Sequence, residues 1–252
     1  MKYVEIEEAL DMPGLRLILT AGVPGPWGEA AKAVCHVKGL SYTAARQVPG
    51  EKTELLLRAT GQTGAPVALY DGERPRSGWA EILFLAERLV PEPALVPRDA
   101  AERALMLGLA HEICGEQGLG WSRRLMMLGR ALPQGARPER GSIPWKYGAD
   151  DPDAAAGARA RVEQILGVLA AQLRLQKQVG RRFLVGERLS ALDLYWAVFS
   201  NMVQPLPPEL CPMPDWMRPL YQLPTGGAPL DPALLELRDR VYRDFLPLPL
   251  DF

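Results

Sequence analysis

The chain has 252 residues with 29 Lys and Arg against 30 Asp and Glu, and this balance provides no net field to attract nucleic acid or an anionic membrane. No segment approaches the roughly 20 apolar residues that span a bilayer, and the acidic N-terminus lacks the apolar core of a targeting signal, so we expect a soluble cytoplasmic protein. Three widely spaced cysteines and two histidines argue against a disulfide framework, and we expect no metal site.

The first sixty residues predict alternating strands and helices. Leu15–Thr20 is a short apolar run that ends at glycines and prolines, which indicates a buried strand. Good helix formers with apolar side chains at three- and four-residue spacing predict a helix over residues 27–38, stopped by Gly39. Residues 41–48 alternate weakly as a second strand, and residues 51–59 predict a short amphipathic helix. The order is therefore βαβα.

A second group of elements begins at a proline. Pro66 stands directly before a β-prone run that ends at the dipeptide Asp71-Gly72, and this pattern predicts a hairpin with a short second strand at residues 74–76. Ser77 is expected to cap the helix that follows. Together these segments complete a small α/β domain.

The proline-rich residues 90–98 predict a linker between two domains. We expect the α/β domain at residues 1–89 and an all-helical domain at residues 99–252. Helical spacing predicts one long helix over residues 99–132, and a polar loop rich in glycine and proline follows at residues 132–152.

The remaining chain predicts three further helices. Residues 154–179 form a second long helix, and residues 231–245 a final amphipathic one. Between them, Ser190 and Asp193 have the spacing of a capping box. The helix that they start is apolar on nearly every side, which is typical of a helix at the centre of a helical domain.

This order of elements, with Pro66, the Asp71-Gly72 turn and the S-x-x-D box at Ser190, resembles the glutathione S-transferase superfamily over nearly the whole chain. The resemblance implies a thioredoxin-like N-terminal domain, an all-helical C-terminal domain, a cis peptide at Pro66 and a homodimer. In that family the residue before the proline, here Ala65, pairs through its main chain with the cysteinyl part of glutathione. Glutathione is therefore the implied co-substrate, although Pro66 read alone could simply begin an edge strand.

The family's catalytic serine or cysteine has no counterpart here. Counting back from the end of the first helix, that position falls near Gly25, in the segment Gly25-Pro26-Trp27-Gly28. A hydroxyl or thiol there normally favours the thiolate of glutathione. We expect the backbone N–H groups of Gly25, Trp27 and Gly28 to replace it in part, because a helix N-terminus favours an anion.

The family's Glu-Ser or Asp-Ser pair, which binds the γ-glutamyl end of glutathione, is also altered. The gapless match is Ser77-Gly78 and a match shifted by one residue is Arg76-Ser77, so the acid is missing either way. Ser77 and Gly78 are expected to bind a carboxylate through the N–H groups of the helix start. Trp79 follows, and it is either a wall for the ligand or an ordinary packed aromatic side chain.

In the helical domain, the resemblance implies a substrate cleft along the middle of the first long helix, with His111, Trp121 and Arg124 as candidate contacts. His111 is a candidate general base, and the alternative is an ordinary surface or packed histidine. Cys35 is expected to be a small buried hydrophobic residue.

The leading hypothesis is a glutathione S-transferase-like enzyme that adds the glutathione thiolate to a small apolar electrophile. The alternative is a binding or assembly module with the same fold that does not use glutathione, and the missing hydroxyl and acid motivate it. A thiol-disulfide oxidoreductase is disfavoured, because the first helix has no C-x-x-C motif.

Overall fold

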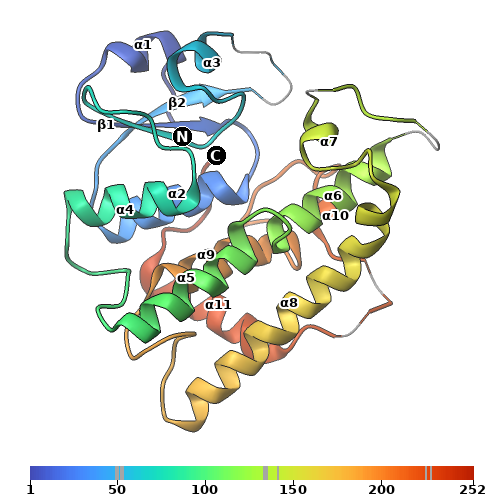
Figure 1. Cartoon of the computed structure of the whole chain (residues 1–252). Coiled ribbons are helices and arrows are strands. Elements are labelled where there is room, and N and C mark those ends of the chain that lie inside the picture. Colours follow the sequence, from blue (N-terminus) through green and yellow to red (C-terminus); the bar gives the residue numbers. More distant parts are fainter. Residues whose placement is uncertain (49–50, 52–53, 133–135, 141, 225, 228) are drawn as a thin grey trace. The chain divides into compact units, whose positions relative to one another are not determined.

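The computed structural model describes residues 1–48, 51, 54–132, 136–140, 142–224, 226–227 and 229–252, and its contacts divide the chain into two compact units (Figure 1). Unit 1 comprises Met1–Leu95, Pro207–Met213 and Phe245–Phe252. Unit 2 comprises Val96–Leu206 and Pro214–Asp244. The linker at residues 90–98 remains a proposal. Two segments of unit 1, Pro207–Met213 and Phe245–Phe252, come from the part of the chain that was expected to form the helical domain.

Unit 1 is built on a three-stranded sheet with strand order β2-β1-β3, in which β2 is parallel and β3 antiparallel to β1. Helices α1 and α3 lie on one face of the sheet, and α2 and α4 on the other (Figure 1). The strands are β1 (Leu15–Thr20), β2 (Thr43–Gln47) and β3 (Val67–Tyr70), and the helices are α1 (Ile6–Asp11), α2 (Pro26–Val37), α3 (Glu54–Thr60) and α4 (Trp79–Leu89).

The central strand explains this layering. Successive side chains of a strand point to opposite faces, so the four apolar residues of this strand supply two cores. Leu15, Leu17 and Leu19 pack with α2 and α4, whereas Ile18 packs with α1 and α3. The strand predicted from this run is confirmed, and α1 is an element that the sequence analysis did not predict.

Two expectations near β3 are wrong in detail. The predicted strand at residues 74–76 is a single antiparallel bridge between Arg76 and Ala68, and before it the Glu73 amide closes a turn onto the Tyr70 carbonyl at 3.0 Å. The following helix begins at Trp79 with Gly78, not Ser77, at its N-cap position. The amides of Ser77 and Gly78, just before the helix, donate instead to the side chain of Glu81. Residues 52 and 53 of the predicted 51–59 helix lie outside the described residues.

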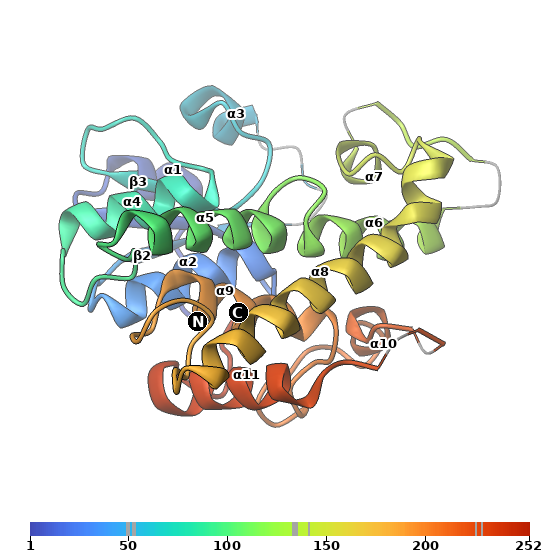
Figure 2. The ribbon, with the colours of Figure 1, turned by 60° about the horizontal axis from the view of Figure 1, so that its bottom comes forward.

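Unit 2 is helical, and Figure 2 shows α5, α8 and α11 as its long rods. Within it α5 packs on α9, and α6 packs on α8. Its elements are α5 (Ala100–Cys114), α6 (Leu119–Ala131), α7 (Ile143–Lys146), α8 (Pro152–Gln178), α9 (Ala191–Phe199), a 3-10 turn (Ser200–Met202), α10 (Arg218–Tyr221) and α11 (Pro232–Phe245).

The single helix expected over residues 99–132 is two helices, α5 and α6. The break lies at Gly115–Gly118, where Gln117 has a positive φ of 59°. A Cβ atom on Gly118 would stand 2.7 Å from the carbonyl oxygen of Glu112, so only glycine fits this corner. The predicted loop at residues 132–152 contains the short helix α7, and residues 133–135 and 141 lie outside the described part.

The capping box at the start of α9 is confirmed. Asp193 accepts hydrogen bonds from the amide of Ser190 at 2.9 Å and from its hydroxyl at 2.8 Å, and a further one from the amide of Leu184 at 2.8 Å. Every residue of α9 is buried, as its nearly continuous apolar surface predicted. The helix therefore forms the centre of unit 2.

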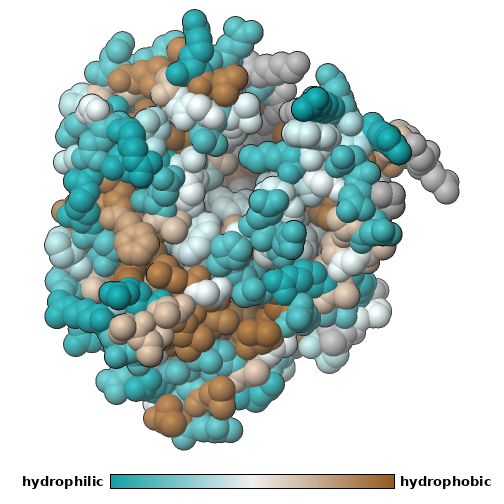
Figure 3. Space-filling model, in the orientation of Figure 1, coloured by the Kyte–Doolittle hydropathy of each residue, from teal (hydrophilic) through white to brown (hydrophobic). Residues whose placement is uncertain are grey.

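The surface mixes hydrophilic side chains with smaller hydrophobic areas (Figure 3). Three exposed apolar residues recur at helical spacing, Val168 and Leu175 on α8 and Val179 at its C-cap. Among the helices of the described residues, none combines the length and apolar character needed to cross a membrane.

Candidate functional site

The sheet of unit 1 brings three chain segments to one end. Because β1 and β3 are antiparallel with Ile18 opposite Val67, the residues before β3 lie at the end where β1 leads towards α2. The bridge from Arg76 to Ala68 then runs the chain back along β3, so that α4 also begins at this end. The Ala65-Pro66 peptide and the first turns of α2 and α4 therefore share one rim of the sheet.

The first segment is Ala65-Pro66, whose peptide bond is cis, as the family resemblance implied. Pro66 is buried and Ala65 is half-buried. Among the described residues, neither the amide nor the carbonyl of Ala65 pairs with another main-chain group, because the ladder with β1 begins at Val67. An extended peptide ligand can pair with both groups.

The second segment is the start of α2. Gly25 is the N-cap and Pro26 the first helical residue, so the N–H groups of Trp27 and Gly28 occupy positions where the helix itself supplies no acceptor. The Gly25 amide already donates to the Val23 carbonyl at 2.8 Å and is engaged there. The Gly25 amide was one of three expected to face a sulfur anion, and its hydrogen bond to Val23 leaves it unable to do so.

Gly25 itself leaves room for a side chain. Its backbone angles, φ −65° and ψ 115°, are accessible to any residue, and a Cβ atom built there meets nothing within 4 Å. The nearest hydroxyl of β1, that of Thr20, is hydrogen-bonded to Oε1 of Gln47 at 3.2 Å. The surrounding structure therefore has room for a side chain at position 25, and the hydroxyl or thiol is missing only because the sequence has glycine there.

The third segment, the start of α4, is occupied by the carboxylate of Glu81. Its Oε2 accepts hydrogen bonds from the amides of Ser77 and Gly78, each at 3.2 Å, and its Oε1 accepts one from Nη1 of Arg74 at 2.8 Å. The Arg74 hydrogen bond, with those of the two amides, holds the pKa of Glu81 below its ordinary value. Trp79, the first residue of the helix, is half-buried.

Glutathione fits part of this rim. The main chain of Ala65, which pairs with no other main-chain group in the described part of the chain, suits its cysteinyl unit, and the α2 start suits a thiolate. Its γ-glutamyl carboxylate does not fit the α4 start as it stands, because the amides of Ser77 and Gly78 already donate to Glu81. Neither residue supplies an acid for the ligand's ammonium group.

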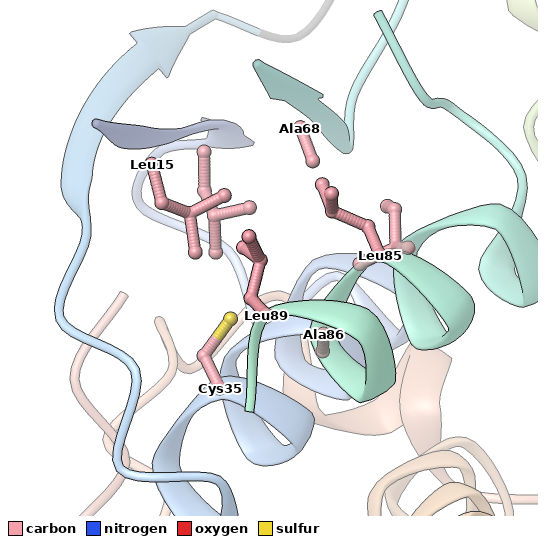
Figure 4. Close-up of a pocket in the computed structure, with 8 residues that line it drawn as sticks. Leu15, Cys35, Ala68, Leu85, Ala86 and Leu89 are labelled. Atoms are coloured by element: carbon pink, nitrogen blue, oxygen red, sulfur yellow. The ribbon is translucent and has the colours of Figure 1, made fainter. Parts of the chain in front are cut away.

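Cys35 is not a nucleophile in this site. Its side chain lies among apolar residues of β1, β3 and α4, including Leu15, Ala68 and Leu85 (Figure 4). Burial raises the pKa of the Cys35 thiol to about 12, so it stays protonated at neutral pH. The expectation of a small buried hydrophobic residue is confirmed.

In unit 2, Trp121 and Arg124 belong to one cluster on α6. The Trp121 ring lies 4.6 Å from that of Tyr147, and Nη2 of Arg124 donates to the hydroxyl of Tyr221 at 3.3 Å. The Arg124 guanidinium also lies over the Tyr221 ring, 5.7 Å from its centre. Burial raises the pKa of Tyr147, so its hydroxyl remains a proton donor.

His111 lies in the last turn of α5, outside that cluster of α6 side chains. The residue is exposed, and its ring covers Gly115, where a Cβ atom would stand 2.6 Å from Nε2. The described residues contain no group of three or more His, Cys, Asp or Glu side chains arranged to hold a metal ion.

Two residues of these sites were not singled out from the sequence as functional. Glu81 could have been found, since an acid three positions after an N-cap is half of a capping box. Tyr221 could not, because it reaches α6 from a segment far away in the chain.

The sequence matches no protein-family model and no curated protein. Solved structures do match, over nearly their whole length. A glutathione S-transferase from Methylobacterium radiotolerans, in complex with glutathione sulfonate, is 20% identical, with 94% of this chain and 97% of that one covered and a TM-score of 0.63.

Two further structures give the same result. Ure2p in complex with glutathione is 12% identical, with 92% of this chain and 95% of that one covered and a TM-score of 0.65. The Tau class glutathione S-transferase from mango, Mangifera indica, is 19% identical, with 93% of each chain covered and a TM-score of 0.60. A thioredoxin-like unit followed by a helical unit is thus a shared architecture, and this chain has the glutathione S-transferase fold.

Proposed function

We propose that the protein binds glutathione through the main chain of Ala65 and adds its thiolate to a small apolar electrophile. The observation that carries the proposal is that the amide and carbonyl of Ala65, on the rim where α2 begins, pair with no main-chain group of the described residues. Solved structures of this fold with glutathione or its sulfonate bound support the ligand.

The thiolate would be stabilised by the start of α2. Gly28 is the third helical residue, and its N–H, together with that of Trp27, is directed out of the helix end that favours an anion. In the reaction the thiol proton leaves to solvent, the sulfur forms a bond to the electrophilic carbon, and the leaving group departs with the electron pair of its own bond. We propose the cluster of Trp121 and Arg124, and separately His111, as candidate electrophile contacts.

Isothermal titration of the full chain with glutathione tests the binding step directly. We expect saturable binding at millimolar ligand. Heat changes no larger than those of buffer over that range would remove glutathione from the proposal, and with it the conjugation reaction.

A change at Gly25 tests the catalytic step. Because a side chain fits there, Gly25→Ser introduces the missing hydroxyl, which can donate to the thiolate. We expect the conjugation rate with 1-chloro-2,4-dinitrobenzene to rise by about tenfold, the effect of a little over 1 kcal/mol in the transition state. Gly25→Ala adds the same Cβ without a hydroxyl and should leave the rate near that of the unchanged protein. Equal rates in the two variants would show that the sulfur does not lie beside residue 25.

The alternative function is a binding or assembly module that carries the same fold without conjugating glutathione. Its motivating observation is that Gly25 has no side chain and that Glu81 fills the start of α4. It predicts negligible turnover of generic electrophiles. Good turnover that Trp27→Ala abolishes would exclude it.

We also expect a homodimer, as the family resemblance implies. Static light scattering of the purified chain distinguishes a mass near 55 kDa, roughly twice the 27.7 kDa of one chain, from that of a monomer.

A further inference from the structure

The start of α4 already holds a carboxylate that belongs to the chain. Both oxygens of Glu81 are engaged, one by the amides of Ser77 and Gly78 and the other by the Arg74 guanidinium. Two amide donors at a helix N-terminus beside a guanidinium make a carboxylate receptor, and here its occupant is intramolecular.

This occupant competes with any ligand carboxylate brought to the same place. Each amide N–H has one hydrogen to donate, so a second carboxylate at Ser77 and Gly78 would find no free donor. It would also meet the negative charge of Glu81 at close range. The contact is nevertheless easy to open, since the Glu81 side chain is 40% exposed and that of Arg74 68%.

We propose that Glu81 closes the γ-glutamyl subsite from within, and that glutathione fills this subsite only when the Glu81 side chain swings out and Arg74 turns to the ligand carboxylate. The inference rests on the proposed function, because glutathione is the ligand. It makes the start of α4 an autoinhibitory contact that weakens glutathione binding while the thiol end still pairs at Ala65.

An ordinary helix cap would use the same hydrogen bonds, so stability measurements alone do not test the inference. Its distinguishing consequence concerns the ligand. Loss of Glu81 should improve binding of a ligand that carries the γ-glutamyl carboxylate and leave unchanged the binding of a ligand that lacks it. Glutathione and cysteinylglycine form such a pair, since they share the cysteinyl and glycyl units.

The experiment titrates the full chain and its Glu81→Ala, Glu81→Gln and Glu73→Ala variants with both ligands. Glu73 is the matched control, because it pairs with Arg76 and Arg88 near the same turn but does not accept from the α4 amides. We expect Glu81→Ala to tighten glutathione binding by about tenfold and to leave cysteinylglycine unchanged within about twofold. Glu73→Ala should change neither ligand, and adding Arg74→Ala to Glu81→Ala should reverse most of the gain.

The outcomes separate this inference from the function on which it rests. Unchanged glutathione affinity in Glu81→Ala, with clear binding by the unchanged protein, overturns the role of Glu81 and leaves glutathione binding standing. An equal gain for both ligands overturns it as well, because the effect would then not involve the carboxylate. If no variant binds glutathione at millimolar concentration, both proposals fall. Glu81→Gln keeps an acceptor for the helix start and removes only the negative charge, so it carries the test should Glu81→Ala lose helical structure by circular dichroism. We then expect glutathione to bind more tightly by less than tenfold with cysteinylglycine unchanged, and an unchanged glutathione affinity would overturn the inference.

Discussion

Asp193 shows how one buried carboxylate can both specify a helix and make stability depend on pH. It is fully buried, and the cost of desolvating its charge raises its pKa from 3.8 to about 6, although hydrogen bonds from Leu184, Ser190 and its own main chain oppose that shift. A folded-state pKa above the unfolded one means that the folded chain binds the proton more tightly. This stabilisation is fully present below about pH 4 and is lost as the pH rises through 6.

We therefore expect stability to fall across that window in a way that Asp193→Asn abolishes. A shift from 3.8 to about 6 corresponds to at most about 3 kcal/mol. Urea unfolding of both proteins from pH 4 to 7 measures the difference between their free energies of unfolding. The acidic side chains elsewhere are common to both proteins and cancel. A difference that stays constant with pH would contradict the assignment.

Arg123 is a second buried charge with a structural task. It is 1% exposed, and its guanidinium donates to the carbonyl oxygens of Met202 at 2.6 Å and Leu220 at 3.0 Å, with longer bonds to Tyr221 and Gln222. These carbonyls belong to the turn after α9 and to the end of α10, so one planar group of donors ties two segments to α6.

Replacing it by an apolar side chain of similar length leaves those buried carbonyls without a donor. We expect Arg123→Met to lower the free energy of unfolding by about 3 kcal/mol or more. The matched change Arg174→Met removes an exposed arginine paired with Asp231 and should cost less than about 1 kcal/mol. Chemical denaturation of the two variants gives the comparison, and similar losses in both would refute the anchoring role.

At the scale of elements, the corner between α5 and α6 depends on one glycine. A Cβ atom on Gly118 would approach three main-chain oxygens, at 2.7 to 2.9 Å, and main-chain atoms cannot yield as a flexible side chain can. Gly108, in the middle of α5, has nothing within 4 Å of its own Cβ position and is exposed.

The two glycines should respond in opposite directions to the same substitution. We expect Gly118→Ala to lower the melting temperature, with a loss of about 2 kcal/mol from the clash at the corner. Gly108→Ala should stabilise the protein by about 0.5–1 kcal/mol, because alanine is the better helix former. Differential scanning calorimetry gives both values. An unaffected Gly118→Ala protein would mean that the corner can open at little cost.

Some of these elements could be predicted from the sequence, and others could not. The runs that became β1 and α9 are mostly apolar, and the strand and the buried helix predicted from them are confirmed. The break between α5 and α6 was missed because helical spacing continues across it. Only the approach of the carbonyls makes Gly118 obligatory, and that approach is set by how the two helices pack.

At the scale of the whole molecule, the last residues of the chain complete unit 1. Lys32 on α2 donates to the carbonyl of Asp251 at 2.6 Å, and the Leu250 amide donates to the Leu210 carbonyl at 2.8 Å. Contacts place Phe245–Phe252 and Pro207–Met213 in the same compact unit as the sheet. A unit assembled from three separate stretches of chain depends on each of them.

Deletion of residues 246–252 should therefore loosen α2 more than it loosens the helices of unit 2. We expect the amide protons of α2 to exchange faster with solvent and those of α8 to keep their protection. Hydrogen exchange measured by mass spectrometry compares the two helices within one sample. Equal acceleration in both, or none in α2, would contradict the role of this segment.

The candidate site was also predictable only in part from the sequence. The resemblance that pointed to Ala65, Pro66 and the start of α2 came from residues adjacent in the chain, where turn and capping chemistry is local. The cis bond at Pro66 is present, while the roles of the named site residues remain proposals. Ser77 was expected to cap α4. Instead, the side chain of Glu81, the third residue of the helix, accepts hydrogen bonds from the amides of Ser77 and Gly78.

The sequence by itself determined the periodic elements and their order, because burial of an apolar face is written into the spacing of the side chains. Only the tertiary structure decided which amides are already satisfied, that Gly25 donates to Val23 and that Gly78 donates to Glu81. It also decided that the end of the chain joins the first unit. A hydrogen bond depends on atoms within about 3 Å in space, and spacing along the chain does not fix which atoms those are.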